Sequence, residues 1–436
     1  MEFDSSALPA DWQVKPIREA YAFTKKPRGL SIRSDSPVPF LPMEAIPIGR
    51  VQVSTYEERL GSALSSGTYI EKGDLLIAKI TPSFENGKQA IVDWDRPFGF
   101  ATTEVIPIQE IKGVSNRFFL FHLLLHPAIR SDLAGKMDGT TGRQRLSKEV
   151  LGSLLIPLPP LPEQRKIAGV LGVVQRAVEQ QERLLQFTAE LKKTLLHQLF
   201  TQGLRGEPQK QTEIGLVPES WEVVRLEDIC TFLSGGTPSK QKAEFWTGSI
   251  PWVSPKDMKK PRLSDVADHI SDAALEDGSS LAPTGSVFVV IRGMILAKDV
   301  PVALAEVPIA FNQDMKAVIP GPRIIPTFLL YALVAFKQNL FKKVGRSAHG
   351  TMTLMSSELA QFSIPLPDKE TQEEIAAAIS TVERKHEYHR RKRVALTDLF
   401  HTLLRQLMTA QIRVHDLDLD ELPLKLAAEI PQQVVE

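Results

Sequence analysis

The chain has 436 residues, one cysteine, a hydrophobic fraction of 43% and a formal net charge of +0 at pH 7. This length predicts two or three domains, and a single cysteine excludes both a disulfide framework and a cysteine-based zinc site. The zero charge argues against simple nucleic-acid binding through a basic domain. The longest apolar run, residues 328–336, is too short for a membrane span of about 20 residues. The N-terminus lacks a signal-peptide pattern, so we expect a cytoplasmic protein.

The first segment, residues 1–157, is predicted to form a mixed α/β domain. It opens with Leu-Pro-Ala-Asp-Trp around Trp12, which we expect to be a core anchor. The apolar run at residues 75–80 follows a Gly-Asp turn and predicts a buried strand. A Gly-rich, locally basic loop occupies residues 136–148. Arginine and lysine on such loops suit phosphates and guanine edges, so our candidate contacts in this domain are Lys79, Thr81, Arg143 and Arg145.

Residues 158–206 are predicted to form one long helix. Four prolines within residues 157–162 favour an extended connector, and Pro162 suits the first helical position, with Glu163 in the first turn. Apolar residues then recur every three or four positions, which predicts a stripe along a rod of roughly 60 Å. The stripe residues expected at an interface with a partner subunit or with the second long helix are Ile167, Leu171, Val174, Val178, Leu185, Leu195 and Leu199.

The second segment, residues 207–366, follows the same order as the first. Trp221 opens it as Trp12 opens the first, residues 287–292 form an apolar run, and residues 342–351 form a Gly-rich basic loop. A further loop, Ser-Gly-Gly-Thr-Pro-Ser-Lys at residues 234–240, stands only here. The candidate contacts are Thr237, Ser239, Lys240, Arg292, Arg346, His349 and Thr351. Arg143 and Arg292 are best placed by the pattern for base edges, and Lys240 for phosphate. The alternative is that these loops are solvated and have no partner.

Residues 367–413 repeat the long helix, and residues 414–436 are predicted to be an acidic and mixed tail. The motif at residue 156 recurs at residue 364, an offset of 364 − 156 = 208, with about 19 identities in 50 gapless positions. Its stripe adds Ile375, Ile379, Val382, Leu399, Leu403 and Leu407. Such long apolar stripes favour two helices packed as an antiparallel pair. The alternative is two unrelated helices, each docked on its own domain.

At these residues the chain resembles the specificity subunits of Type I restriction–modification systems. The resemblance is carried by Pro-Leu-Pro-Pro-Leu-Pro-Glu-Gln-Arg-Lys-Ile-Ala at residues 157–168, by its duplicate and by the Gly-Gly-Thr-Pro-Ser loop. It implies an α+β fold with two mixed α/β target recognition domains separated by two long antiparallel helices, in an internal two-fold repeat. It also implies a chain without catalysis that reads a gapped, bipartite site in double-stranded DNA.

The resemblance further implies two methyltransferase subunits and restriction (translocase) subunits as partners. It implies no cofactor in this chain, because S-adenosylmethionine, ATP and magnesium would belong to those partners, and no membrane. The sequence contains neither a Gly-x-x-x-x-Gly-Lys-Ser/Thr phosphate loop nor a Gly-x-Gly-x-x-Gly motif. Two alternatives stay open: a coiled-coil scaffold without DNA readout, which neutral domains favour, and a specificity subunit of a methylation-only defence assembly.

Overall fold

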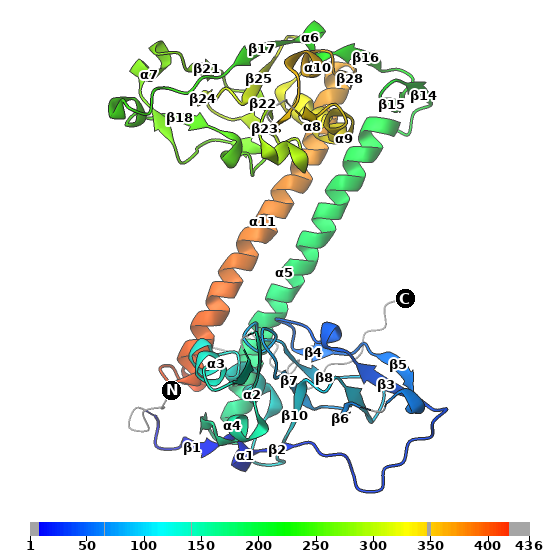
Figure 1. Ribbon diagram of the computed structural model, residues 1–436, viewed down its shortest axis with the longest axis vertical. Coiled ribbons are helices and arrows are strands. Elements are labelled where there is room, and N and C mark those ends of the chain that lie inside the picture. The colour runs from blue at the N-terminus through cyan, green and yellow to red at the C-terminus, as the bar shows by residue number, and fades with distance from the viewer. Residues whose placement is uncertain (1–7, 65, 141, 347–349, 418–436) are drawn as a thin grey trace. The chain divides into compact units, whose positions relative to one another are not determined.

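The computed structural model describes residues 8–64, 66–140, 142–346 and 350–417. The chain divides into two compact units, Met1–Leu185 with Tyr388–Glu436, and Gln186–Glu387. Each unit combines one mixed α/β segment with part of α5 (Leu161–Gln202) and part of α11 (Lys369–Met408) (Figure 1). The predicted α+β class and internal repeat are confirmed. The boundaries between the two units fall within α5 and α11, whereas the sequence analysis treated each long helix as a segment separate from the α/β domains.

The first unit contains a five-stranded and a four-stranded sheet. The five-stranded order is β2-β10-β7-β8-β4, with only β4 parallel to its neighbour among these described strands, and the four-stranded order is β5-β3-β9-β6. The strands of these sheets are β2 (Tyr21–Phe23), β3 (Pro37–Leu41), β4 (Gln52–Val53), β5 (Glu57–Leu60), β6 (Thr68–Glu71), β7 (Leu75–Ala78), β8 (Gln89–Val92), β9 (Phe98–Ala101) and β10 (Val105–Glu110). Around them lie α1 (Ile17–Ala20), α2 (Arg117–Leu123), α3 (Pro127–Ala134), α4 (Lys148–Ser153) and the hairpin β11 (Asp138–Thr140) and β12 (Arg143–Arg145).

The second unit repeats this topology strand for strand. Its five-stranded order is β17-β25-β22-β23-β19 and its four-stranded order is β20-β18-β24-β21. The strands are β17 (Cys230–Ser234), β18 (Ile250–Val253), β19 (Arg262–Leu263), β20 (His269–Ile270), β21 (Ser280–Ala282), β22 (Val287–Val290), β23 (Val302–Ala305), β24 (Ile309–Phe311) and β25 (Met315–Pro320). The other elements are the hairpin β14 (Gln209–Thr212) and β15 (Gly215–Pro218), α6 (Leu226–Ile229), α7 (Asp272–Glu276), α8 (Pro326–Ala335), α9 (Lys337–Phe341), the hairpin β26 (Gly345–Arg346) and β27 (Met352–Thr353), and α10 (Ser356–Ala360).

The central strand of each five-stranded sheet lies in the core. In β7, Leu75 and Ile77 pack with residues of α2 and α5, whereas Leu76 packs with the four-stranded sheet, as the alternation of side chains along a strand requires. In β22 all four residues are fully buried, in a cluster that contains residues of α8, α5 and α11. The predicted tryptophan anchors are also buried, Trp12 at 7% and Trp221 at 2% exposure.

Each proline-rich segment begins in a strand, which holds its first proline, and the extended connector is shortened to the two residues between that strand and the long helix. β13 (Leu155–Leu158) pairs antiparallel with β1 (Gln13–Pro16), and β28 (Ser363–Leu366) pairs in the same way with β16 (Glu222–Arg225). Each pair is a two-stranded sheet, so one side of every strand has no neighbouring strand. A proline, which has no backbone N–H to donate, is tolerated where its nitrogen faces that side. The repeated motif therefore joins the two ends of its own α/β segment before it starts the long helix.

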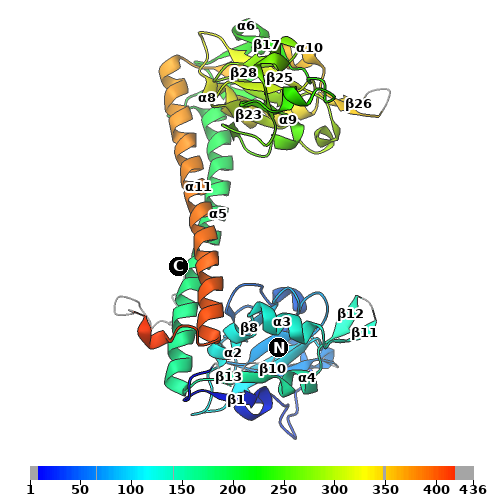
Figure 2. The same cartoon turned by 90° about the vertical axis from the view of Figure 1, so that its left-hand side faces the viewer.

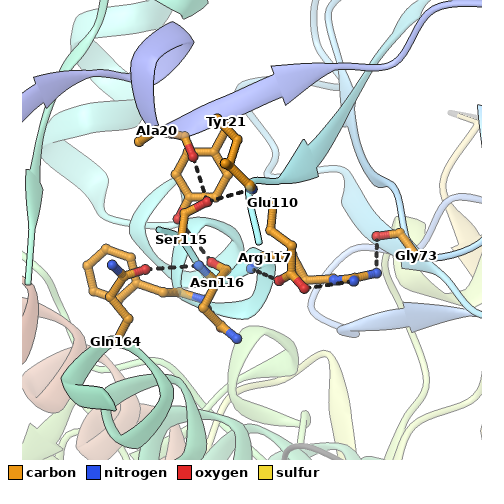
Figure 3. Close-up of polar contacts among 10 residues, drawn as sticks. Ala20, Tyr21, Gly73, Glu110, Ser115, Asn116, Arg117 and Gln164 are labelled. Atoms are coloured by element: carbon orange, nitrogen blue, oxygen red, sulfur yellow. Dashed lines mark hydrogen bonds and ion pairs between the residues drawn. The ribbon is translucent and has the colours of Figure 1, made fainter. Parts of the chain in front are cut away.

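A buried glutamine fixes the start of each long helix. The Gln164 amide accepts from the backbone amide of Asn116 (2.9 Å) and donates to the carbonyls of Val114 (3.0 Å) and Pro159 (2.8 Å). Figure 3 shows Gln164 facing the start of α2, where Ser115 also bonds to Ala20. One side chain thus connects the helix, the proline-rich strand and α2.

The second unit has the same bonds at the position 208 residues later. Gln372 accepts from the amide of Ile325 (3.0 Å) and donates to the carbonyls of Arg323 (3.0 Å) and Pro367 (2.9 Å). Both glutamines are fully buried. Asp368 caps α11 by accepting from the Thr371 amide. The repeated Glu/Thr-Gln pattern therefore has a structural cause.

Within each unit α5 and α11 run side by side in opposite directions (Figures 1 and 2). Polar pairs join them: Gln181–His389 and Glu182–Arg393 in the first unit, Thr188–His386 and Lys192–Glu383 in the second. In the first unit Glu163 pairs with Arg413 and Gln181 with His389, and in the second Thr188 pairs with His386 and Lys192 with Glu383. In both units the residue numbers thus fall along the second partner as they rise along α5, which confirms the predicted antiparallel pairing. These pairs are polar, whereas towards the ends apolar residues of both helices lie in the same α/β core. The alternative, in which each helix docks on its own domain alone, is therefore not supported.

Most of the predicted stripe is buried or half-buried, whereas Leu399 is exposed. The buried members are Ile167, Leu171, Leu199, Ile375, Ile379, Val382 and Leu407, and the half-buried ones are Val174, Val178, Leu185, Leu195 and Leu403. Leu399 is 45% exposed, while Phe400 beside it is buried at 9% in the first unit's core. A helix turns about 100° per residue, so Leu399 and Phe400 lie on different faces of α11.

The predicted tail begins too early. Arg413 donates to Glu163 and to Asp11, and Trp12 donates to the same Glu163 (3.0 Å). Val414 is buried at 1% in the first unit's core. The first residues of the predicted tail therefore belong to the first unit, and residues 418–436 lie outside the described part.

Replacing Gln164 by alanine should lower the free energy of unfolding by about 2–4 kcal/mol, because buried backbone groups of Asn116 and Val114 lose their partner. Gln372→Ala should do the same in the second unit. The measurement is urea unfolding of the whole chain. Gln180→Ala, at an exposed position of the same helix, is the matched control and should stay within about 0.5 kcal/mol of the wild type. Equal effects of the three variants would contradict the assignment.

A buried carboxyl group stands directly before β7. Asp74 accepts from the Thr24 hydroxyl (2.9 Å) and the Glu71 amide (2.8 Å) and is fully buried. Burial outweighs these bonds and raises the pKa of Asp74 to about 6. The folded chain therefore binds this proton more tightly than the unfolded chain, whose aspartate pKa is about 3.9.

The stability that this proton provides is complete below about pH 4 and is lost as the pH rises through about 6. Asp74→Asn keeps the hydrogen-bonding shape and removes the titration. From pH 4 to pH 8 its free energy of unfolding should gain up to about 3 kcal/mol relative to the wild type. Urea titrations at several pH values measure this difference, with the exposed Asp138→Asn as control. A difference that does not change with pH would refute the shift.

Candidate nucleic-acid interface

In the first unit the β11–β12 hairpin lies against the end of β7. Ile80 and Arg145 form an antiparallel bridge, and the Thr81 amide donates to the carbonyl of Gln144 (3.0 Å). These backbone contacts join the strand end to a loop more than 60 residues later in the chain. The candidate contacts of this domain therefore meet at one edge of the sheet: Lys79, Thr81, Arg143 and Arg145.

The four side chains at this edge have different partners. Arg145 donates through Nε and Nη2 to both carboxylate oxygens of Glu104, at 2.9–3.2 Å, and its guanidinium holds the pKa of that carboxyl below its usual value. The Thr81 hydroxyl donates to Glu85 (2.9 Å). Arg143 is exposed, and within the described part of the chain its side chain has no hydrogen-bond or ion-pair partner. Lys79 is half-buried.

The second unit places the β26–β27 hairpin against the end of β22. Arg292 and Thr353 form the bridge, and the Gly293 amide donates to the carbonyl of Met352 (3.0 Å). The Nη1 atom of Arg292 lies 3.8 Å from Oδ1 of Asp314, in the turn before β25. This edge therefore gathers three candidates, Arg292, Arg346 and Thr351, and the fourth, His349, lies outside the described residues.

The Gly-Gly-Thr-Pro-Ser loop packs on the same turn. The Gly236 amide donates to the carbonyl of Phe311 (2.9 Å), and the Thr237 hydroxyl donates to Gln313 (2.5 Å). A Cβ on Gly235 would lie 2.3 Å from the Asn312 carbonyl oxygen, so the close approach requires glycine. The loop thus brings Thr237 to the turn that carries Asp314.

Ser239 and Lys240 follow a different course. The Ser239 carbonyl accepts from the Trp246 indole (3.2 Å), which stacks edge-on against Trp252. Lys240 is exposed, and no partner for its amine is found among the described residues. These two residues therefore lie beside the four-stranded sheet, and the contacts do not bring them to the Arg292 edge.

Strand register relates the two edges residue by residue. Ala78 pairs with Val105 in the first unit, and Val290 pairs with Met315 in the second. Ile80 is therefore equivalent to Arg292. Lys79 is equivalent to Ile291, so the basic candidates Lys79 and Arg292 lie on opposite faces of equivalent strands.

Sequence reasoning missed the acidic residues of both edges. Glu104 and Asp314 precede equivalent strands, β10 and β25, and each faces an arginine. The signal was present, because the segments 100–104 and 311–314 match in sequence order. A pattern of basic residues alone does not reveal these matched carboxylates.

Other kinds of site find no support in the described residues. Among them, no group of three or more His, Cys, Asp or Glu side chains is arranged to hold a metal ion. None of the helices within the described ranges is long and apolar enough to cross a membrane.

The chain matches a family model twice. The model describes the Type I restriction modification DNA specificity domain, and the matches cover residues 9–186 and 218–398. The two matched ranges correspond to the two structural repeats. Together they cover well over half of the chain.

Curated relatives carry the same description. The Type I restriction enzyme EcoR124I/EcoR124II specificity subunit of Escherichia coli is 32% identical over 240 residues, 55% of this chain and 57% of the relative. The MjaIX specificity subunit of Methanocaldococcus jannaschii is 31% identical over 42% of each chain. The chain thus spans about half the length of these two relatives. The putative MjaX specificity subunit of the same organism is 20% identical over 93% of this chain and 95% of the relative.

Solved structures agree with the fold. The S subunit of a Type I restriction–modification system from M. genitalium has a TM-score of 0.59 at 15% identity, over 92% of this chain and 98% of the other. A chain from a structural study of complex assembly in the type I R-M system has a TM-score of 0.51 at 21% identity and the same coverage. The predicted resemblance to specificity subunits is confirmed.

Proposed function

This chain belongs to the family of the Type I restriction modification DNA specificity domain, and on that premise we propose that it reads a gapped, bipartite site in double-stranded DNA. Each unit reads one half-site through the edge formed by its hairpin and its central strand. The halves need not match, because one chain carries both readers. The chain itself contributes specificity and no catalysis, which agrees with the description of its relatives as specificity subunits.

One observation carries this proposal: two equivalent edges are built on the same backbone contacts but present different side chains. The bridges Ile80–Arg145 and Arg292–Thr353 are equivalent, yet the residues at each position differ. A scaffold that repeats while its exposed polar residues change fits two readers of different sequences. Direct readout depends on those side chains, because each base pair shows a distinct pattern in the major groove.

The partners in this proposal are two methyltransferase subunits, with restriction (translocase) subunits added for cleavage in the cytoplasm. Leu191 and Leu399 are equivalent in the repeat and are 52% and 45% exposed. One exposed leucine at the same position of each long helix supports two equal docking surfaces for methyltransferase subunits. S-adenosylmethionine, ATP and magnesium would be bound by these partners.

The second candidate is a coiled-coil scaffold that binds proteins and not DNA. The balance of charge favours it, since residues 1–157 carry 19 Lys+Arg against 18 Asp+Glu and residues 216–366 carry 15 against 15. A strong decrease of duplex binding with rising salt would favour the DNA-reading function, because neutralised phosphates release counterions. A methylation-only assembly would use the same DNA-reading function and differ in lacking a restriction partner.

Co-expression of this chain with its methyltransferase should produce methylation at a gapped, bipartite motif. Replacing residues 1–157 by those of another specificity subunit should change one half-site and leave the other intact. Sequencing that detects methylated bases across a genome measures both. A strain with the methyltransferase alone is the control. A swap that changes both half-sites, or a wild-type complex without any motif, would contradict the proposal.

Changing Leu191 or Leu399 to lysine should weaken the complex with the methyltransferase at least tenfold, because a charge would be buried in an apolar contact. Fold stability should be nearly unchanged, since both side chains are exposed. Analytical ultracentrifugation of the co-expressed subunits measures the stoichiometry, and one variant should lose one subunit. Gln198→Lys, also exposed on α5, is the control. Full assembly of the double variant would refute these docking surfaces.

A further inference from the structure

Each unit holds an arginine against an equivalent carboxylate, but the arginine comes from opposite strands of the equivalent bridge. In the first unit Arg145 of the hairpin faces Glu104, and in the second unit Arg292 at the end of β22 faces Asp314. The two bridges show that these arginines start from facing positions of one strand pair. In both units a guanidinium therefore lies beside the acidic residue that precedes β10 or β25. It comes from the hairpin in the first unit and from the end of the central strand in the second.

The bonds of Arg145 to Glu104 leave the Nη1 side of its guanidinium without a partner among the described residues. Its Nε and Nη2 atoms are used by Glu104, at 2.9 and 3.0 Å. Within the described residues no partner occupies Nη1 or the second N–H of Nη2, and half of the side chain is exposed. Two neighbouring N–H groups of this kind donate side by side to O6 and N7 of guanine.

Arg292 is held less firmly in the same place. The 3.8 Å separation from Asp314 is an ion pair and not a hydrogen bond, and 56% of the arginine side chain is exposed. Asp314 is itself oriented by Asn312, which accepts from its backbone amide (3.1 Å) and donates to its carboxylate (3.4 Å). The carboxylate is therefore fixed and the arginine can move closer to it or to a base.

We infer that each unit reads one guanine through this arginine, Arg145 in the first and Arg292 in the second, with Glu104 and Asp314 as positioning residues. This inference rests on the proposed function. It moves the base-reading role in the first unit from Arg143 to Arg145.

The carboxylate favours a base edge over a phosphate as the target. A negative charge beside the arginine weakens its attraction for phosphates, which supply the sequence-independent part of DNA binding. The same carboxylate holds the guanidinium in one orientation before DNA arrives, so less side-chain freedom is lost on binding. The carboxylate therefore lowers the sequence-independent affinity for DNA and raises the discrimination between bases.

The test uses the complex of the full chain with its methyltransferase, and duplexes that carry the methylation motif of the wild type. Replacing each guanine in turn by 7-deazaguanine removes the N7 acceptor. At one guanine per half-site the wild type should lose about tenfold in affinity. Arg145→Ala should abolish that loss in the first half-site only, and Arg292→Ala in the second only.

Glu104→Gln keeps the size of the side chain and should reduce discrimination at the guanine read by Arg145. It should leave unchanged or raise the affinity for DNA without the motif, which a merely structural role would not do. Arg143→Ala is the matched control and should weaken binding to all duplexes alike, with a smaller salt dependence. Thermal melting of each variant reports folding.

Two outcomes would overturn the inference while the proposed function stands. One is a wild-type motif without a guanine in a half-site. The other is an Arg145→Ala complex that folds and still responds to 7-deazaguanine as the wild type does. A wild-type complex without a motif would instead be a failure of the proposed function.

Discussion

The fold of each unit depends on one buried side-chain amide. Gln164 and Gln372 each connect a long helix, a proline-rich strand and the helix that covers the sheet, through bonds of 2.8–3.0 Å. A buried amide that loses such partners leaves backbone groups unsatisfied. The direction in which each long helix leaves its α/β segment is therefore set by a polar contact, whereas the stripe of apolar residues supplies the area that is buried.

The neutral charge of the chain does not exclude edges that bind bases. At both edges the arginine that faces outward stands beside an acid, Glu104 or Asp314. Such pairs add nothing to the net charge, so composition cannot reveal them. A surface that relied on phosphate attraction would need unpaired basic residues, and its binding would be largely independent of sequence. Neutrality is thus compatible with a reader of bases.

The sequence predicted the repeat, both long helices and the central strands, because these features depend on periodicity and on turn residues. The DNA contacts that it assigned to the loops at residues 136–148 and 342–351 stay a prediction. The sequence did not distinguish the faces on which Lys79 and Arg292 lie, because a shift of one residue reverses the face of a strand. The position of Glu104 was detectable from the matched segments 100–104 and 311–314. Its pairing with Arg145 and the bonds of Gln164 were not predictable, because those partners are distant in the chain.

The hairpins explain how one scaffold can carry two different edges. The amide of Leu146 donates to the carbonyl of Lys79 (2.7 Å), and the amide of Leu354 donates to that of Ile291 (2.8 Å). These bonds join backbone to backbone, so they hold the hairpin whatever side chains the edge displays. The arginine can therefore stand on the hairpin in one unit, as Arg145, and on the central strand in the other, as Arg292, while the hairpin stays attached in both. A surface that must change its sequence preference needs this separation, because base contacts specify while the supporting contacts only position.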